Sequence, residues 1–223
     1  MMRTPEPEIM DGSEQSAAYA NADFTAVNAG FVASFAARFD TFAGGVLIDL
    51  GCGPAEICLL LAQTYTTAQV HGVDASEEML GHGRRAIAQA HLDGRVRLHQ
   101  RYLPLAGETG LPLADAVVSN SLLHHLAAPE TLWQTIARVG RPGAAVYVMD
   151  LLRPASIADA SEIVDRYAAG EPDVLRHDFF HSLCAAYRVD EIEEQLENSG
   201  LRGMAVDVIS DRHVCVSGCL PAM

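Results

Sequence analysis

The chain has 223 residues, of which 49% are hydrophobic, and its formal net charge at neutral pH is −14. This length and composition suffice for one domain with a substantial core. The acidic balance excludes neither an enzyme nor a binding protein, but it disfavours nucleic-acid partners, because binding to phosphate backbones requires a basic surface. It equally disfavours an anionic membrane surface.

The five cysteines and the apolar runs bear on where the protein works. The cysteine number is odd, the spacings fit no zinc motif, and we see no signal peptide, so we expect free thiols in the cytoplasm and no bound metal. No apolar run approaches 18 residues, so we expect no membrane span. The oligomeric state stays open between monomer and homodimer.

The N-terminal region reads as a helical arm over residues 1–40. Residues 1–12 favour a loose segment, and residues 13–21 favour a short helix. A second helix is predicted over residues 25–39, because phenylalanines and a valine recur there at helical spacing. Packing of that aromatic stripe against a sheet is the simpler interpretation, and closure of a pocket is the alternative.

The stretch V-L-I-D-L-G-C-G-P-A-E, residues 46–56, is the strongest local signal. Its apolar beginning is typical of a strand buried on both faces. Gly51 and Gly53 then predict a turn, and Pro54 suits the first turn of a helix that we expect to end near Tyr65. A strand, a glycine turn and a helix let a ligand approach bare backbone at the carboxyl end of the strand.

The next segment predicts a ribose site. Residues 69–74 read as a second strand that ends in Asp74, and Ser76 can cap a helix reaching about residue 91. Asp74 lies 21 residues after Gly53, a separation at which a carboxylate accepts hydrogen bonds from a ribose diol. The two segments together predict a nucleoside site.

Glu56 helps to identify the nucleoside. It stands where dinucleotide-binding turns have a third glycine, which allows close approach of a pyrophosphate. A glutamate there would crowd and repel a diphosphate, so an NAD-dependent dehydrogenase is a weaker reading. A carboxylate suits a cationic ligand instead. This points to S-adenosylmethionine, which carries a ribose, an ammonium and a sulfonium but no phosphate.

The rest of the chain alternates strands and helices, which predicts an α/β fold with a doubly wound, mostly parallel sheet. Residues 204–209 and 213–217 are close enough to form an antiparallel hairpin at the C-terminal end. Residues 101–114 read as an irregular crossover and residues 170–188 as a loop with some helix. The other expected elements are strands at 95–99, 115–120 and 144–152, and helices at 129–140, 158–169 and 189–199.

Four ordered segments carry a family resemblance. They are D-L-G-C-G-P at 49–54, G-V-D-A-S at 72–76 with Met79, the run from 115 to 126 with its L-L-H-H-L, and R-P-G-A at 141–144. In this order they resemble class I S-adenosylmethionine-dependent methyltransferases, especially the small-molecule group. The resemblance implies a Rossmann-like seven-stranded sheet with a terminal hairpin. It also implies a single domain, in which residues 41–223 bind the cofactor and the arm covers it.

The resemblance also implies roles for individual residues. Asn120 and Ser121 would lie near the transferred methyl group. The family often places an acid after the third strand to read the adenine, but here Gln100 or a backbone carbonyl must do so. The other implied cofactor residues, from the methionine end to the adenine, are Asp49, Gly51, Cys52, Gly53, Asp74, Ala75 and Met79.

Histidines and aromatic residues are candidates for the acceptor pocket. His124 could act as a general base and His125 could line the pocket. The alternative is that one of them packs or caps a helix and the other lines the pocket without catalysis. His177 and His181 would share one face of a helix, where they could line the pocket or chelate a metal. Tyr19 and Phe24 are the candidates for a lid.

We therefore expect methyl transfer from S-adenosylmethionine to a small molecule by in-line displacement, with S-adenosylhomocysteine as the product. The protein would then supply orientation and, where needed, a base. The alternative is a non-catalytic, cofactor-binding regulatory or assembly protein of the same fold. The missing acid near Gln100 favours that alternative mildly.

Overall fold

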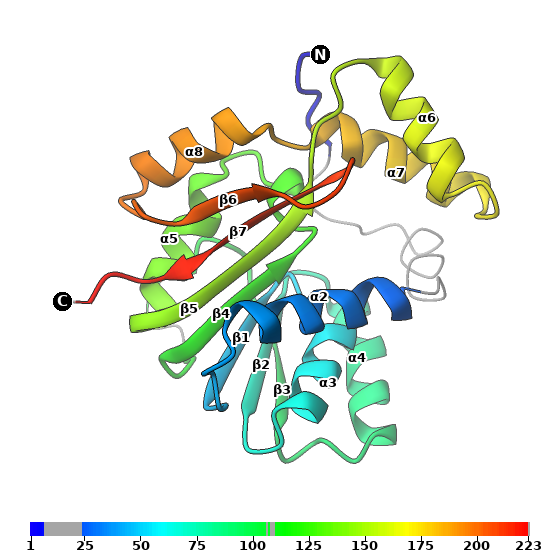
Figure 1. Cartoon of the computed structure of the whole chain (residues 1–223). Helices are drawn as coiled ribbons and strands as arrows, with labels where there is room; N and C mark the ends of the chain where they lie inside the picture. The colour runs from blue at the N-terminus through cyan, green and yellow to red at the C-terminus, as the bar shows by residue number, and fades with distance from the viewer. Residues whose placement is uncertain (7–23, 106, 108–109, 223) are drawn as a thin grey trace.

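The protein is built on one seven-stranded sheet, seen in a computed structural model that describes residues 1–6, 24–105, 107 and 110–222 (Figure 1). The strand order across the sheet is β3-β2-β1-β4-β5-β7-β6. The strands are β1 (Val46–Leu50), β2 (Gln69–Asp74), β3 (Val96–Gln100), β4 (Ala114–Asn120), β5 (Gly140–Leu151), β6 (Ala205–Val208) and β7 (His213–Cys219).

The pairing directions confirm the predicted fold class. Strands β1 to β5 pair in parallel, and β7 runs antiparallel between β5 and β6. The direction in which strands are added to the sheet reverses between β1 and β4. Strands β2 and β3 are added on one side of β1, and β4 and β5 are added on the other. In sheets of this type ligands bind at the carboxyl edge beside such a reversal, so the topology itself locates the site.

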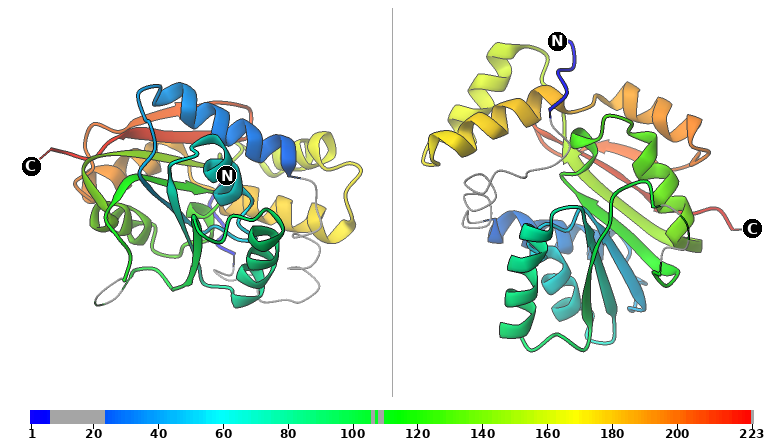
Figure 2. Two further views of the ribbon diagram at one scale, coloured as in Figure 1. Left: turned by 90° about the horizontal axis from the view of Figure 1, so that it is seen from below. Right: turned by 180° about the vertical axis from the view of Figure 1, so that it is seen from behind.

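Helices cover both faces of the sheet because its strands alternate their side chains. Leu47 packs with α2 (Thr25–Arg38), α3 (Glu56–Thr64) and α4 (Glu77–Gln89), whereas its neighbour Ile48 packs with α5 (Glu130–Val139) and α8 (Val189–Asn198). Figures 1 and 2 show these two helical layers from opposite sides.

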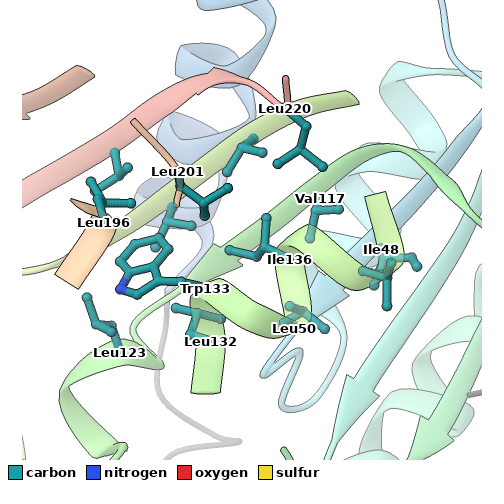
Figure 3. Close-up of a cluster of buried hydrophobic side chains, with 14 of the residues drawn as sticks. Ile48, Leu50, Val117, Leu123, Leu132, Trp133, Ile136, Leu196, Leu201 and Leu220 are labelled. Atoms are coloured by element: carbon teal, nitrogen blue, oxygen red, sulfur yellow. The ribbon is translucent and has the colours of Figure 1, made fainter. Parts of the chain in front are cut away.

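Trp133, on α5, lies in the core. Its side chain is fully buried, and it packs beside Leu196 and Leu201 (Figure 3). Its indole N–H donates to Gln195 Oε1 at 3.0 Å, which satisfies the one polar atom of the ring. This contact joins α5 to α8 beneath the last strands.

The cap over the carboxyl edge differs from the prediction. Residues 170–188 were expected to be a loop with some helix, but α7 (Asp173–Ala185) is a regular helix of 13 residues. It packs with α6 (Ile157–Tyr167) in a small core of its own, above the sheet in Figure 1. The helix has no clean apolar stripe, because one side packs on α6 while another borders an internal cavity.

Most other boundaries agree with the predictions to within a few residues. Ser76 caps α4, accepting from the backbone N–H of Met79 at 3.3 Å. Helix α3 begins at Glu56 rather than Pro54, because Ala55 has a positive φ of 65°. In α2, Phe31 and Phe35 are buried against the sheet layer.

The first six residues are docked rather than loose, which corrects the prediction. The backbone N–H of Thr4 donates to the Cys184 carbonyl at 3.0 Å. The Arg3 guanidinium donates to the carbonyls of Ala185 and His124 at 2.6 and 2.9 Å. The predicted helix at 13–21 lies outside the described residues. No helix in the described part of the chain is long and apolar enough to cross a membrane.

Candidate active site

The loop after β1 presents bare backbone to the carboxyl edge. Gly51 and Gly53 have φ angles of 74° and 50°, a region that favours glycine. The backbone N–H of Gly51 donates to the Val73 carbonyl at 2.8 Å, which ties the loop to the end of β2. A Cβ on Gly51 would lie 2.9 Å from Leu122 Cδ1, whereas a Cβ on Gly53 would meet no atom within 4 Å.

Asp74 joins this loop to the start of α4. Its Oδ2 accepts from the Gly53 N–H and its Oδ1 from the Ser76 N–H, both at 2.8 Å. Burial raises the pKa of Asp74, although these two hydrogen bonds act in the opposite direction. Each carboxylate oxygen keeps a second lone pair, so the side chain can still accept two hydroxyl groups.

Asp49 is a second carboxylate, held under the loop and 1% exposed. The Cys58 thiol donates to its Oδ2 at 3.3 Å. Burial raises the pKa of Asp49 to about 7, and the nearby charge of Asp74 adds to the rise. A carboxyl group with this pKa changes its charge near neutral pH, which matters for any cationic ligand beside it.

Helix α2 forms one wall of a small recess beside Asp49. The Asn28 amide donates to Glu56 Oε2 at 2.6 Å, so the residue at the third-glycine position is held by α2. The recess also shares Gly53 and Asn120 with a larger cavity next to it. The arm helix and the glycine loop therefore enclose the same space.

A short 3-10 helix, η1 (Leu123–His125), follows β4 and carries the two histidines. His124 is buried, and its Nδ1 lies 2.5 Å from Asp150 Oδ1 on β5. Burial acts to lower the pKa of His124, but the charge and hydrogen bond of Asp150 outweigh it and raise that pKa. The same partner lowers the pKa of Asp150 against its own burial. Asp150 thus stabilises the positive charge that His124 gains when it takes up a proton.

The larger cavity has a volume of about 410 Å³ and runs along the carboxyl edge between the sheet and α7. Gly53 and Asp74 line it from the ends of β1 and β2, and His124 and His125 line it from η1. The α7 wall is formed by Leu175, Asp178, Phe179 and Ser182.

Most predicted site residues meet in this space. Asp49 and Cys52 line the recess. Those that line the larger cavity are Phe24, Gly51, Gly53, Asp74, Ala75, Met79, Asn120, Ser121, His124 and His125. Gly51, Gly53, Asp74, Ala75, Asn120 and Ser121 come from the ends of β1, β2 and β4 or the loops that follow them. Parallel strands bring these ends together at the carboxyl edge of the sheet.

Three predicted residues lie elsewhere. Gln100 is exposed, and its amide donates to the Ala75 carbonyl at 3.2 Å instead of facing the cavity. His177 and His181 share a helix face as expected, with ring centroids 4.3 Å apart, but that face of α7 does not line the cavity. Tyr19 lies outside the described residues.

Sequence reasoning missed several residues that the structure adds. Asp150 lies near the end of β5, so the carboxyl-edge rule could have identified it. No sequence pattern identifies Glu6 as a site residue, because only the docking of the first residues brings it to His124. Arg101, Tyr102 and Leu103 line the cavity after β3, where the family's acid was sought.

The two loop glycines make a matched test of ligand position. We expect Gly53→Ala to lower the free energy of unfolding by only about 1 kcal/mol, the cost of its positive φ. It should weaken binding of S-adenosylhomocysteine at least tenfold, because the new methyl group projects into the open space above the loop. Gly51→Ala should destabilise the fold more, since its methyl group meets Leu122. Thermal unfolding and calorimetric titration measure both effects. Wild-type affinity in Gly53→Ala would place the ligand elsewhere.

Comparisons with known proteins agree with this geometry. A family model described as a methyltransferase domain matches residues 42–171. An O-methyltransferase of Aspergillus sclerotiorum is 28% identical over 80% of this chain and 64% of its own length. An arsenite methyltransferase of Halobacterium salinarum is 26% identical over 73% of this chain and 39% of its own. The chain thus spans less than two thirds of the length of these curated relatives.

Solved structures show the same fold. The plantazolicin methyltransferase in complex with SAH superposes with a TM-score of 0.71 at 13% identity, covering 95% of this chain and 91% of that one. A putative S-adenosylmethionine-dependent methyltransferase of Methanococcus maripaludis gives a TM-score of 0.71 at 18% identity, covering 100% and 98%. With more than half of its residues matched by the family model, the chain belongs to the methyltransferase domain family and has the fold of class I S-adenosylmethionine-dependent methyltransferases.

Proposed function

We propose that the protein transfers the methyl group of S-adenosylmethionine to a small-molecule acceptor by in-line displacement. One observation carries the proposal. A single cavity connects the glycine loop and Asp74, suited to a nucleoside, with His124 and His125, suited to an acceptor. Such an arrangement holds two reactants in one enclosed space, which is how positioning lowers the barrier to displacement.

The residues of this cavity and its recess fit the cofactor. Asp74 keeps lone pairs for the ribose hydroxyls, and the space above Gly53 is open. Asp49 supplies a buried carboxylate for the ammonium of the methionine part. Ala75 and Met79 offer an apolar surface for the adenine. When bound, S-adenosylmethionine supplies an electrophilic methyl group, and the chain contributes binding and orientation.

The acceptor side favours a small, partly apolar molecule. Phe24, Leu175 and Phe179 line the cavity, and its volume of about 410 Å³ is typical of a site for a small molecule. The net charge of −14 supports the absence of a nucleic-acid partner. The five cysteines form no disulfide, which supports action in a reducing compartment such as the cytoplasm. A monomer or a homodimer fits this function.

His124 is the proposed proton acceptor when the acceptor group must be deprotonated. Asp150 holds its Nδ1, so Nε2, which lies 3.4 Å from Glu6 Oε1, is the nitrogen that would take up the proton. A general base contributes typically about 10²- to 10⁴-fold to a rate. His125 lies beside it with ring centroids 4.2 Å apart and forms part of the wall.

A turnover assay tests the proposal. The full chain is incubated with S-adenosylmethionine and a panel of phenols, thiols, amines and carboxylates, and release of S-adenosylhomocysteine is measured. We expect release that depends on one acceptor class and falls at least a hundredfold in His124→Ala if the acceptor needs a base. Release that is absent for every acceptor, despite tight cofactor binding, would contradict catalysis.

The same assay addresses the alternative of a non-catalytic binding protein. The observation that favours this alternative is the end of β3. There the Gln100 amide donates to the Ala75 carbonyl, and none of the described residues that line the cavity after β3 is an acid. If the alternative holds, S-adenosylhomocysteine binds but no acceptor is methylated. Reproducible, acceptor-dependent turnover would exclude it.

A further inference from the structure

Three donor atoms converge beside η1, where His124 and His125 border the cavity. Glu6 Oε1 lies 3.4 Å from His124 Nε2 and 3.2 Å from His125 Nδ1. The three ligand atoms all lie within 4.8 Å of one another. The side chains are well shielded, with exposed fractions of 13%, 3% and 16% for Glu6, His124 and His125.

The separations fit an ion between the donors. Nitrogen and oxygen ligands lie about 2.0 to 2.2 Å from a zinc ion, so neighbouring donors are about 3.0 to 3.4 Å apart in octahedral or tetrahedral geometry. Direct, charge-assisted N–H···O contacts are shorter, about 2.7 to 2.9 Å. The distances of 3.4 and 3.2 Å from Glu6 to the two imidazoles fall in the first range, and the separation of the two imidazole nitrogens is at most 4.8 Å.

Outer hydrogen bonds orient two of the three donors. Asp150 Oδ1 engages His124 Nδ1 at 2.5 Å, which directs the lone pair of Nε2 toward Glu6. The Ser182 hydroxyl donates to Glu6 Oε1 at 3.0 Å and leaves the second lone pair of that oxygen available. Metal-bound histidines and carboxylates have partners of this kind, which fix the tautomer and the ring orientation.

The charges beside η1 also favour a cation. Asp150 contacts His124 and Asp178 lines the neighbouring cavity, so two further acids lie near Glu6 and the imidazoles. Arg3 lies nearby, but its guanidinium hydrogen bonds go to the carbonyls of Ala185, His124 and Leu126. A bound cation would offset the negative charge where the donors meet.

We propose that Glu6, His124 and His125 bind one divalent transition-metal ion, such as zinc or iron(II), at the wall of the cavity. One carboxylate and two imidazoles suit such ions, and three protein ligands leave coordination positions open. The open positions would accept an oxygen or nitrogen atom of the acceptor and lower its pKa. With the ion bound, this role would replace proton transfer to His124 Nε2, which would then be a ligand. That last role rests on the proposed function, whereas the metal site does not.

The docked N-terminal residues would hold one ligand of the proposed metal site in place. Arg3 and Thr4 anchor the first residues to η1 and α7, and this anchoring delivers Glu6 to the histidines. The ion would therefore join the start of the chain to the site. This proposal differs from the sequence-based expectation of no metal, and the proposed site does not include the His177–His181 pair on α7.

Cobalt(II) binding to the untagged full-length chain tests the proposal. The protein is stripped with a chelator and titrated with cobalt(II), whose visible absorption reports coordination number, and zinc(II) is then added as a competitor. We expect one cobalt per chain. Glu6→Gln and His125→Ala should each weaken binding at least tenfold. The matched control is the double variant His177→Ala, His181→Ala, which removes the other close histidine pair and should bind as wild type does.

The outcomes are distinct. Loss of binding in Glu6→Gln and His125→Ala, with wild-type thermal unfolding and an intact control, supports the site. Absence of binding at millimolar cobalt(II) would overturn the proposal, as would binding that survives both variants or disappears only in the control. Because no cofactor or acceptor is present, failure of metal binding would leave the proposed methyl transfer standing.

Discussion

Replacing Asp74 by alanine is expected to weaken binding of S-adenosylhomocysteine by about a hundredfold. The ribose loses two hydrogen bonds to an ionised group, worth together about 3 kcal/mol, which corresponds to roughly two orders of magnitude in Kd. The substitution also removes the acceptor for the Gly53 and Ser76 N–H groups, so the loop after β1 loses an anchor. Calorimetric titration of the purified variant measures the change.

Gln100→Ala is the matched control for this variant. Both residues end neighbouring strands, but Gln100 is exposed and turned away from the cavity. We expect its Kd to stay within twofold of wild type, which would also exclude it as the reader of the adenine. Unchanged affinity in Asp74→Ala, with the fold intact by thermal unfolding, would show that the ribose does not lie at this carboxylate.

Binding of S-adenosylhomocysteine should strengthen as the pH rises through about 7, because Asp49 must lose its proton to pair with the ligand's ammonium. If only the ionised form binds, affinity falls about tenfold per pH unit below the pKa, or about thirtyfold between pH 8.5 and pH 5.5. The raised pKa of Asp74 acts in the same direction. Burial helps to raise the pKa of the Cys52 and Cys58 thiols, so these stay neutral in this range.

Asp49→Asn separates the contribution of this carboxyl group. The variant should bind weakly and lose the step near pH 7. The ligand-free wild-type protein should also lose stability as the pH rises from about 4 to about 7, because its folded state holds the Asp49 proton more tightly than the unfolded chain does. The loss is at most about 4 kcal/mol, and Asp49→Asn should remove it. A binding step near pH 7 that persists in the variant would assign it to another group.

The sheet could be predicted because each of its strands carries a local signal. The apolar run before Gly51, the acid at Asp74 and the cap at Ser76 each specify one boundary, and the structure retains all three. Parallel order then places their ends at one edge, so the cofactor residues follow from sequence and topology together. The same argument could have included Asp150.

The acceptor side could not be predicted in the same way. Helix α7 was read partly as loop, because its cavity-facing residues interrupt the amphipathic pattern that sequence reasoning relies on. Glu6 reaches His124 through a contact between residues more than a hundred positions apart, and no local pattern encodes such docking. The two histidines on α7 were recognised as a pair, but only tertiary packing decides which face of a helix borders a cavity.

Calorimetric titration with S-adenosylhomocysteine, with NAD as the control ligand, tests the central claim most directly. The arrangement of Gly53, Asp74 and Asp49 predicts one site per chain with micromolar affinity, about −8 kcal/mol, and no measurable binding of NAD. Tight binding of NAD, or no binding of S-adenosylhomocysteine by the folded protein at pH 8, would contradict the assignment of this cavity to a methyl-donor cofactor.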